Sequence, residues 1–143
     1  MDEKVVMHHS CGFVIFAEVD GVRKYLLLKY PEGHIDFVKG HIENEDENEL
    51  ETAKRELLEE TGIAEVEVVK GYLNVMNYDY FREGLKHVKK VDYFLGKVEF
   101  QEISVSDEHL DFIWCDYEKS LQTVTYDNAR DILISAEAFL TVF

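Results

Sequence analysis

Residues 55–63 read RELLEETGI, and they close the most regular helical segment of the chain, Glu49–Thr61. Asn48 or a neighbouring acidic residue can cap the start of this segment, because short polar side chains accept hydrogen bonds from free backbone amides. Gly62 provides a stop, since glycine readily adopts the left-handed conformation that ends helices. The stretch therefore predicts a helix that ends at Thr61.

This helix has two different faces. Apolar residues fall on one stripe at helical spacing, and they are Leu50, Ala53 and Leu57. Carboxylates dominate the adjoining stripe, and they are Glu49, Glu56, Glu59 and Glu60. The apolar stripe is expected to pack on a core and the acidic stripe to face a solvated or liganded space.

The acidic stripe needs compensation for its own repulsion. Like charges four residues apart, such as Glu56 and Glu60, destabilise a helix by roughly 0.2 to 0.5 kcal/mol per pair. A hard divalent cation such as Mg²⁺ or Mn²⁺ is a natural partner, because these ions prefer carboxylate oxygens. A solvated acidic surface remains the alternative from spacing alone.

The composition limits the classes of partner. The chain has 143 residues with 30 acidic and 15 basic side chains, for a net charge of -15. Non-specific attraction to nucleic acid or anionic membranes is thus disfavoured, and an anionic ligand needs a local basic pocket or a metal. The length suits one domain, residues 1–143. No apolar run approaches the roughly 20 residues of a transmembrane helix, and no signal-peptide pattern is found, so we expect a cytoplasmic protein.

The remaining elements are mainly strands. Two β-rich runs, Gly12–Phe16 and Tyr25–Leu28, are joined through Asp20 and Gly21, which predicts a hairpin, and 30–47 is expected to be a loop. Further strands are expected at Val66–Val69, Gly71–Tyr80, Val91–Phe100 and Phe112–Cys115. Asn128–Phe143 has apolar residues at helical spacing and predicts an amphipathic helix.

The two cysteines and the histidines carry no recognisable metal motif. Cys11 and Cys115 lie in separate apolar runs without a CxxC arrangement, so both are expected to be reduced, buried residues. His8, His9, His87 and His109 show no metal-type spacing and receive no role.

The segment 55–63 resembles the second half of the Nudix box at every specified position. That pattern is Gly, five residues, Glu, seven residues, Arg-Glu, an aliphatic residue, any residue, Glu-Glu, any residue, Gly and an aliphatic residue. The first half departs from it, since one extra residue lies between Gly40 and Arg55. Placing the insertion at 44–46 leaves Glu47 as the first box glutamate, with Asp46 as an alternative.

The Nudix resemblance implies an α/β/α sandwich with a mixed β-sheet and a metal-dependent attack of water on a phosphoanhydride. The residues carried over as metal ligands are Glu56, Glu59, Glu60 and the carbonyl of Gly40. Arg55 would orient a box glutamate. A carboxylate would remove the proton from water, and Glu59 and Glu108 are the two candidates.

The segments 37–43 and 89–95, FVKGHIE and KKVDYFL, are similar to those of the asymmetric diadenosine tetraphosphate hydrolases within this family. This similarity implies a nucleotide substrate cut to ATP and AMP. The residues expected to bind it are His34, Lys39, Tyr80, Lys89, Tyr93 and Tyr126. Other Nudix pyrophosphatases, acting on nucleoside triphosphates, ADP-ribose or an RNA 5′ end, and a non-catalytic nucleotide sensor remain alternatives.

Overall fold

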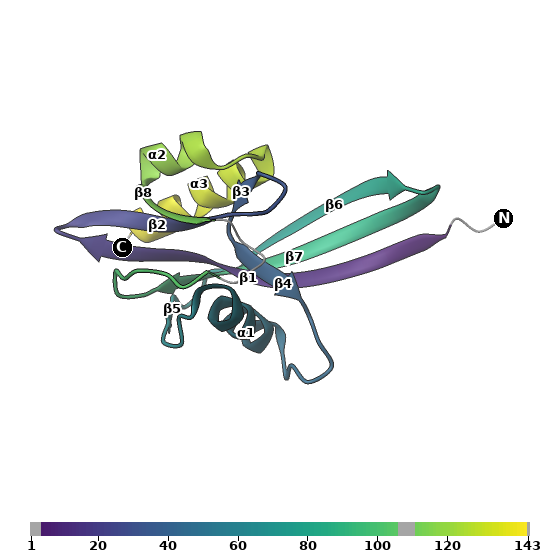
Figure 1. Ribbon diagram of the computed structural model, residues 1–143, viewed down its shortest axis with the longest axis horizontal. Helices are drawn as coiled ribbons and strands as arrows, with labels where there is room; N and C mark the ends of the chain where they lie inside the picture. Colours follow the sequence, from purple (N-terminus) through teal and green to yellow (C-terminus); the bar gives the residue numbers. More distant parts are fainter. Residues whose placement is uncertain (1–3, 106–110, 143) are drawn as a thin grey trace.

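A computed structural model describes residues 4–105 and 111–142. One β-sheet is covered on one face by α1 (Glu49–Thr61) and on the other by α2 (Tyr117–Thr123) and α3 (Asp127–Thr141), as Figure 1 shows. The predicted α/β/α sandwich is confirmed. None of the helices in these two ranges is long and apolar enough to cross a membrane.

The sheet is mixed. Its strands are β1 (Val5–Val19), β2 (Val22–Lys29), β3 (Ile35–Asp36), β4 (Val38–His41), β5 (Glu67–Val68), β6 (Asn74–Arg82), β7 (Leu85–Lys97) and β8 (Asp111–Asp116). The path runs β3-β2-β1-β7-β5, with β4 paired to β1, β6 to β7 and β8 to β2. β1 and β7 are parallel, whereas the other pairs are antiparallel.

Most expected elements are present, with shifted ends. The β1–β2 hairpin turns at Asp20 and Gly21, which have φ values of 51° and 80°. The expected loop at 30–47 is partly wrong, because it contains β3 and β4. These strands are too short to show a sequence period, and they form because β2 and β1 offer them partners. The helix α2 was also not predicted.

The helix α1 begins and ends where its sequence indicates. The Asn48 side chain accepts a hydrogen bond from the Glu51 amide at 2.9 Å, and Gly62 ends the helix with φ 77°. Ala53 and Leu57 are buried against apolar residues of β1. This packing fixes the apolar stripe against the sheet and thereby decides where the carboxylates of the same helix lie.

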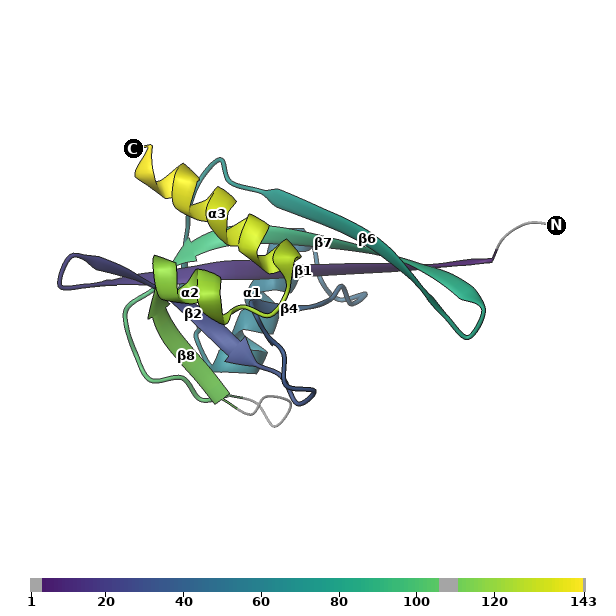
Figure 2. The same cartoon turned by 90° about the horizontal axis from the view of Figure 1, so that it is seen from above.

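The opposite face of the sheet has its own core. Residues of β1, β2 and β7 pack there against the inner side of α3, which contributes Ala129, Ile132, Leu133 and Ala136. The strands β6 and β7, together with the first part of β1, extend well beyond the helices as a ribbon (Figure 2). The base of this ribbon lies beside the start of α3, and the two border a cavity.

Candidate active site

Arg55 is the centre of a hydrogen-bonded network at the end of β4. Its Nε and Nη2 donate to the two carboxylate oxygens of Asp46 at 2.9 and 3.0 Å, and Nη2 also donates to the His41 carbonyl at 2.9 Å. Nη1 donates to Glu56 Oε1 at 2.9 Å and to Glu59 Oε2 at 3.1 Å. One guanidinium thus links the box loop, β4 and two helix carboxylates.

Asp46, rather than Glu47, takes the role of the first box acid. Besides Arg55, its Oδ2 accepts hydrogen bonds from the Thr52 hydroxyl at 2.8 Å and the Glu43 amide at 2.9 Å. The hydrogen bonds from Arg55 hold the pKa of Asp46 well below its usual value. Glu47 is exposed. Of the two alternatives left by the inserted residue, the structure selects Asp46.

Gly40 lets the Glu56 carboxylate approach the backbone of β4. A Cβ atom at Gly40 would lie only 2.0 Å from Cδ of Glu56, and 2.2 and 2.3 Å from its two oxygens. The Glu56 side chain is 12% exposed, and burial raises its pKa above the usual value. Glycine is therefore required at position 40 for this carboxylate to lie where it does.

The other predicted carboxylates differ in exposure. Glu60 is buried at 5% exposure, whereas the Glu59 side chain is 56% exposed. Both come from the same turn of α1 as Glu56. Glu108, the second candidate base, lies outside the described residues.

A cavity of about 560 Å³ lies on the opposite face of the sheet. All six residues predicted to bind substrate line it, together with others from β3, β6 and α3. The full lining consists of His34, Asp36, Lys39, Met76, Tyr78, Tyr80, Lys89, Tyr93, Tyr126, Asp127, Asn128, Ala129 and Ile132. Segments as far apart in the chain as His34 and Ile132 thus meet in one place.

One end of the cavity is an aromatic cluster. The ring of His34 stacks on Tyr30 at 4.7 Å with an interplanar angle of 2°, and Tyr126 lies 5.6 Å away. Thr125 holds this arrangement, because its hydroxyl accepts the Ile35 amide at 2.7 Å and its amide donates to the Ile35 carbonyl at 3.1 Å. The loop before α3 is thereby fixed beside β3, with the half-exposed Tyr126 ring at the mouth.

Two lysines and two aspartates line the cavity, and one lysine is in an ion pair. Lys39 Nζ lies 2.9 Å from Asp36 Oδ2, and burial, with a smaller contribution from Lys39, lowers the pKa of Lys89. Tyr93 forms the floor between them and is 1% exposed, and burial raises its pKa well above the usual value. Tyr93 therefore presents a neutral hydroxyl, while the two lysines supply the positive charge that an anionic ligand needs.

Tyr80 lies at the far end on β6. Its ring stacks on His87 at 4.9 Å, and the His8 ring lies 5.2 Å from His87 and 6.4 Å from Tyr80. Tyr78 lines the cavity too but was not predicted. The period of two along a strand could have found it, since residues 76, 78 and 80 share one face.

The short strand β4 joins the cavity to the carboxylate helix. Lys39 and Gly40 are consecutive, so their side-chain directions point to opposite faces of the sheet. Lys39 lines the cavity, whereas Gly40 lies against Glu56 of α1. Among the described strands β4 pairs with β1 alone, and its His41 carbonyl accepts a hydrogen bond from Arg55 of α1.

This geometry agrees with the sequence relationships of the chain. The sequence profile of the NUDIX domain matches residues 9–135. The chain belongs to the Nudix family. The rat asymmetrical bis(5′-nucleosyl)-tetraphosphatase is 33% identical over 143 aligned residues, covering 92% of this chain and 94% of that protein. The corresponding Caenorhabditis elegans protein is 29% identical over 94% of this chain and 97% of its own length.

Solved structures agree with these relationships. A C. elegans Ap4A hydrolase binary complex superimposes with a TM-score of 0.83 at 28% identity, covering 95% of this chain and 99% of that one. The Escherichia coli dihydroneopterin triphosphate pyrophosphohydrolase has a TM-score of 0.73 at 19% identity and shares the fold. The protein is a Nudix hydrolase that is similar to the asymmetrical tetraphosphatases.

Nudix hydrolases generally depend on divalent metal ions, and the residues of this Nudix hydrolase fit such an ion. The three helix glutamates offer only oxygen donors, which hard cations prefer. Glu56 is held in a position where burial disfavours its charge, and a bound cation would relieve that cost. Because Gly40 has no side chain, the Glu56 carboxylate lies against the backbone segment that carries the Gly40 carbonyl.

Proposed function

We propose that this Nudix hydrolase cleaves diadenosine tetraphosphate asymmetrically to ATP and AMP with Mg²⁺ or Mn²⁺, acting as one catalytic domain, residues 1–143. The curated relatives named above carry that activity in their names. The net charge of -15 favours a small nucleotide over a long nucleic acid. The two buried free cysteines agree with a reducing cytoplasm as the place of action.

One observation carries the proposal. The strand β4 contributes both to the cavity lined by all six expected substrate residues, through Lys39, and to the packing against Glu56 of the carboxylate helix, through Gly40. A polyphosphate held by Lys39 would then extend along β4 toward the glutamates. The cavity combines the aromatic rings of His34, Tyr80 and Tyr126 with two lysines, which suits a ligand that has bases and an anionic linker.

In this proposal Glu56, Glu59, Glu60 and the Gly40 carbonyl hold the cation. The ion supplies positive charge that neutralises phosphoryl oxygens and acidifies the attacking water. Arg55 positions two of these carboxylates through the hydrogen bonds described above. Rigid placement matters, because catalytic groups displaced by about 1 Å can lose on the order of 100-fold in rate.

A carboxylate then accepts the proton of the attacking water. Glu59 is the candidate within the described residues, since it is exposed and oriented by Arg55. Glu108 is the second candidate. Comparing Glu59→Gln with Glu108→Gln separates them, because loss of the base lowers kcat and removes the acidic limb of the pH profile.

The nucleoside parts of the substrate are assigned to the aromatic ends. His34 and Tyr126 would enclose one adenine, while Tyr80 would contact the other end of the substrate. Lys39, Lys89 and the Tyr93 hydroxyl would bind the phosphates between them. Stacking on an aromatic ring contributes about 1 to 3 kcal/mol per base in single-strand binders.

The deciding experiment is product analysis with Mg²⁺ and diadenosine tetraphosphate, run beside ADP-ribose, nucleoside triphosphates and 5′-triphosphorylated RNA. We expect ATP and AMP in equal amounts and a higher kcat/KM than for the other substrates. Two molecules of ADP, or preference for another compound, would overturn the substrate assignment. Calorimetric binding of the dinucleotide without any turnover would instead identify a sensor.

A further inference from the structure

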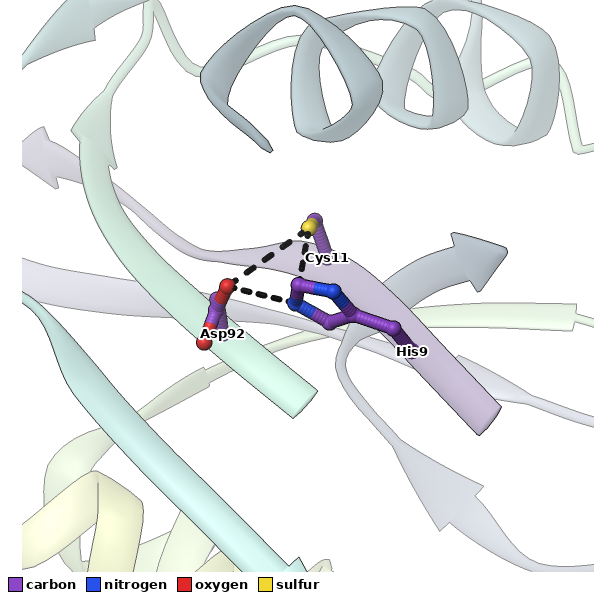
Figure 3. Close-up of side chains that lie close together, drawn as sticks. All are labelled: His9, Cys11 and Asp92. Carbon is purple, nitrogen blue, oxygen red and sulfur yellow. Dashed lines mark hydrogen bonds and ion pairs between the residues drawn. The ribbon is translucent and has the colours of Figure 1, made fainter. Parts of the chain in front are cut away.

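His9, Cys11 and Asp92 form a compact cluster that the proposed reaction does not use (Figure 3). His9 Nε2 lies 2.7 Å from Asp92 Oδ2. The Cys11 sulfur lies 3.9 Å from the same oxygen and 4.0 Å from His9 Nε2. The imidazole, thiol and carboxylate thus point toward a common centre from two neighbouring strands.

The sheet register produces this arrangement. His9 and Cys11 are two residues apart on β1, so their side chains share one face. Asp92 on the parallel strand β7 is the direct register partner of Cys11. Cys11 belongs to the core beneath α1, so the cluster lies on the α1 side of the sheet. His9 and Asp92 are 83 residues apart, which hides the group from any sequence motif.

We propose that His9, Cys11 and Asp92 bind a transition-metal ion of the Zn²⁺ class, separate from the glutamate site. Zn²⁺ takes thiolate, imidazole and carboxylate ligands with bonds of about 2.0 to 2.3 Å, which places tetrahedral ligand atoms about 3.3 to 3.7 Å apart. The observed separations of 2.7, 3.9 and 4.0 Å bracket this spacing. Small side-chain rotations suffice to close the triangle around an ion.

Charge favours a cation at this position. Burial, and after it the carboxylates of Asp92, Glu49 and Asp46, raise the pKa of the Cys11 thiol to about 12, while Lys90 lowers it, and a cation bound beside the thiol would offset this cost of the thiolate. A thiolate and a carboxylate would neutralise the two charges of the ion, while His9 ligates as a neutral imidazole. The thiol proton leaves to solvent as the S–metal bond forms, and no redox step is needed.

The Asp92 carboxylate has spare binding capacity. It is 4% exposed, and within the described residues its Oδ1 is buried without a hydrogen-bond partner, with Lys90 Nζ 3.8 Å away. The atom that faces His9 and Cys11 is Oδ2, so the buried Oδ1 would gain a partner if the carboxylate bound the ion through both oxygens. The fourth position of the ion would face the His9 side, whose side chain is 32% exposed and gives access to water.

An ion here would join β1 to β7 beside β4, because Cys11 also pairs with Gly40 of β4.

The test is a Co²⁺ titration of the full chain in excess Mg²⁺, which occupies the oxygen-only glutamate site. We expect one equivalent of Co²⁺ to give a thiolate-to-metal charge-transfer band in the near ultraviolet. Zn²⁺ should abolish the band by displacing Co²⁺.

Variants assign the ligands. Cys11→Ser should remove the band, whereas Cys115→Ser, which changes the other buried cysteine, should keep it. His9→Gln and Asp92→Asn should each weaken Co²⁺ binding at least about tenfold, a loss that even outer-shell partners of a metal can cause. Glu60→Gln should leave the band unchanged, because Glu60 belongs to the other site. A wild-type protein that shows the band but cleaves none of the nucleotides would refute only the proposed function.

X-ray absorption of the Zn²⁺-loaded wild-type protein needs no variant and covers the case where Cys11→Ser fails to fold. It should show one sulfur at about 2.3 Å and lighter ligands at about 2.0 Å. Absence of the band and of the sulfur ligand would overturn the proposal and leave a hydrogen-bonded pair beside a core thiol. A band lost with Cys115→Ser would overturn it as well.

Discussion

Asp46 binds Arg55 through both carboxylate oxygens, with Nε to Oδ1 at 2.9 Å and Nη2 to Oδ2 at 3.0 Å. A planar guanidinium held in this way has little freedom to rotate. Its remaining nitrogen, Nη1, reaches Glu56 and Glu59 at 2.9 and 3.1 Å. The position of the helix carboxylates thus depends on Asp46, which lies nine residues before Arg55 in the chain.

Replacing Asp46 with Ala should lower activity by about 10- to 100-fold, the range typical of removing a residue that orients metal ligands. The Mg²⁺ concentration needed for half-maximal activity should rise at the same time. Glu47→Ala is the matched control, because Glu47 is exposed, and a surface change of this kind should leave activity within about twofold. Equal effects of the two changes would contradict the assignment.

Gly40→Ala should displace the Glu56 carboxylate, since the new Cβ would lie 2.0 Å from Glu56 Cδ. We expect weaker Mg²⁺ binding by calorimetry and a lower kcat, with little change in KM. The double variant Gly40→Ala, Glu56→Asp tests the cause, because the shorter side chain leaves room for the methyl group. Its Mg²⁺ affinity should fall by less than the sum of the two single changes.

Lys89→Met should raise the KM for the dinucleotide. Hydrogen bonds to charged groups contribute about 1.5 to 3 kcal/mol, which corresponds to roughly 10- to 150-fold. Lys90→Met is the control, because Lys90 points to the other face of the strand, toward Asp92. If Lys90→Met raises KM as much as Lys89→Met, then general attraction of the anion, and not the cavity, explains the effect.

The same Lys89→Met variant should make the ligand-free protein more stable at neutral pH. Burial lowers the pKa of Lys89, so its charged form destabilises the folded state. This cost is complete below the lowered pKa and disappears as the pH rises through the usual lysine pKa of 10.5. Thermal unfolding should therefore show a higher Tm for the variant at pH 7 and convergence of the two proteins above that pKa.

Tyr126→Ala should raise the KM for the dinucleotide by about 5- to 150-fold, equivalent to about 1 to 3 kcal/mol of base stacking. Tyr126→Phe keeps the ring and should leave KM nearly unchanged. Tyr126 is half-exposed, so neither change should lower the Tm appreciably. Equal KM values for the Ala variant and the wild type would remove Tyr126 from the binding site.

The sequence alone determined the parts of the protein that depend on neighbours along the chain. The capped helix at Glu49–Thr61, with Asn48 and Gly62 at its ends, follows from local hydrogen bonds and glycine conformation. The spacing of Glu56, Glu59 and Glu60 follows from helical periodicity, and the resemblance to the Nudix box supplied their interpretation. The hairpin at Asp20 and Gly21 is equally local.

Only the tertiary structure decided which distant residues meet. The strands β3 and β4 exist because β2 and β1 offer edges at the right register, so a short segment alone does not reveal them. The choice of Asp46 over Glu47 depends on how the inserted loop folds onto Arg55. The pairing of β1 with β7 brings Asp92 to Cys11 across 81 residues. Sheet pairing is a long-range interaction, and sequence periodicity carries no information about which partner a strand will find.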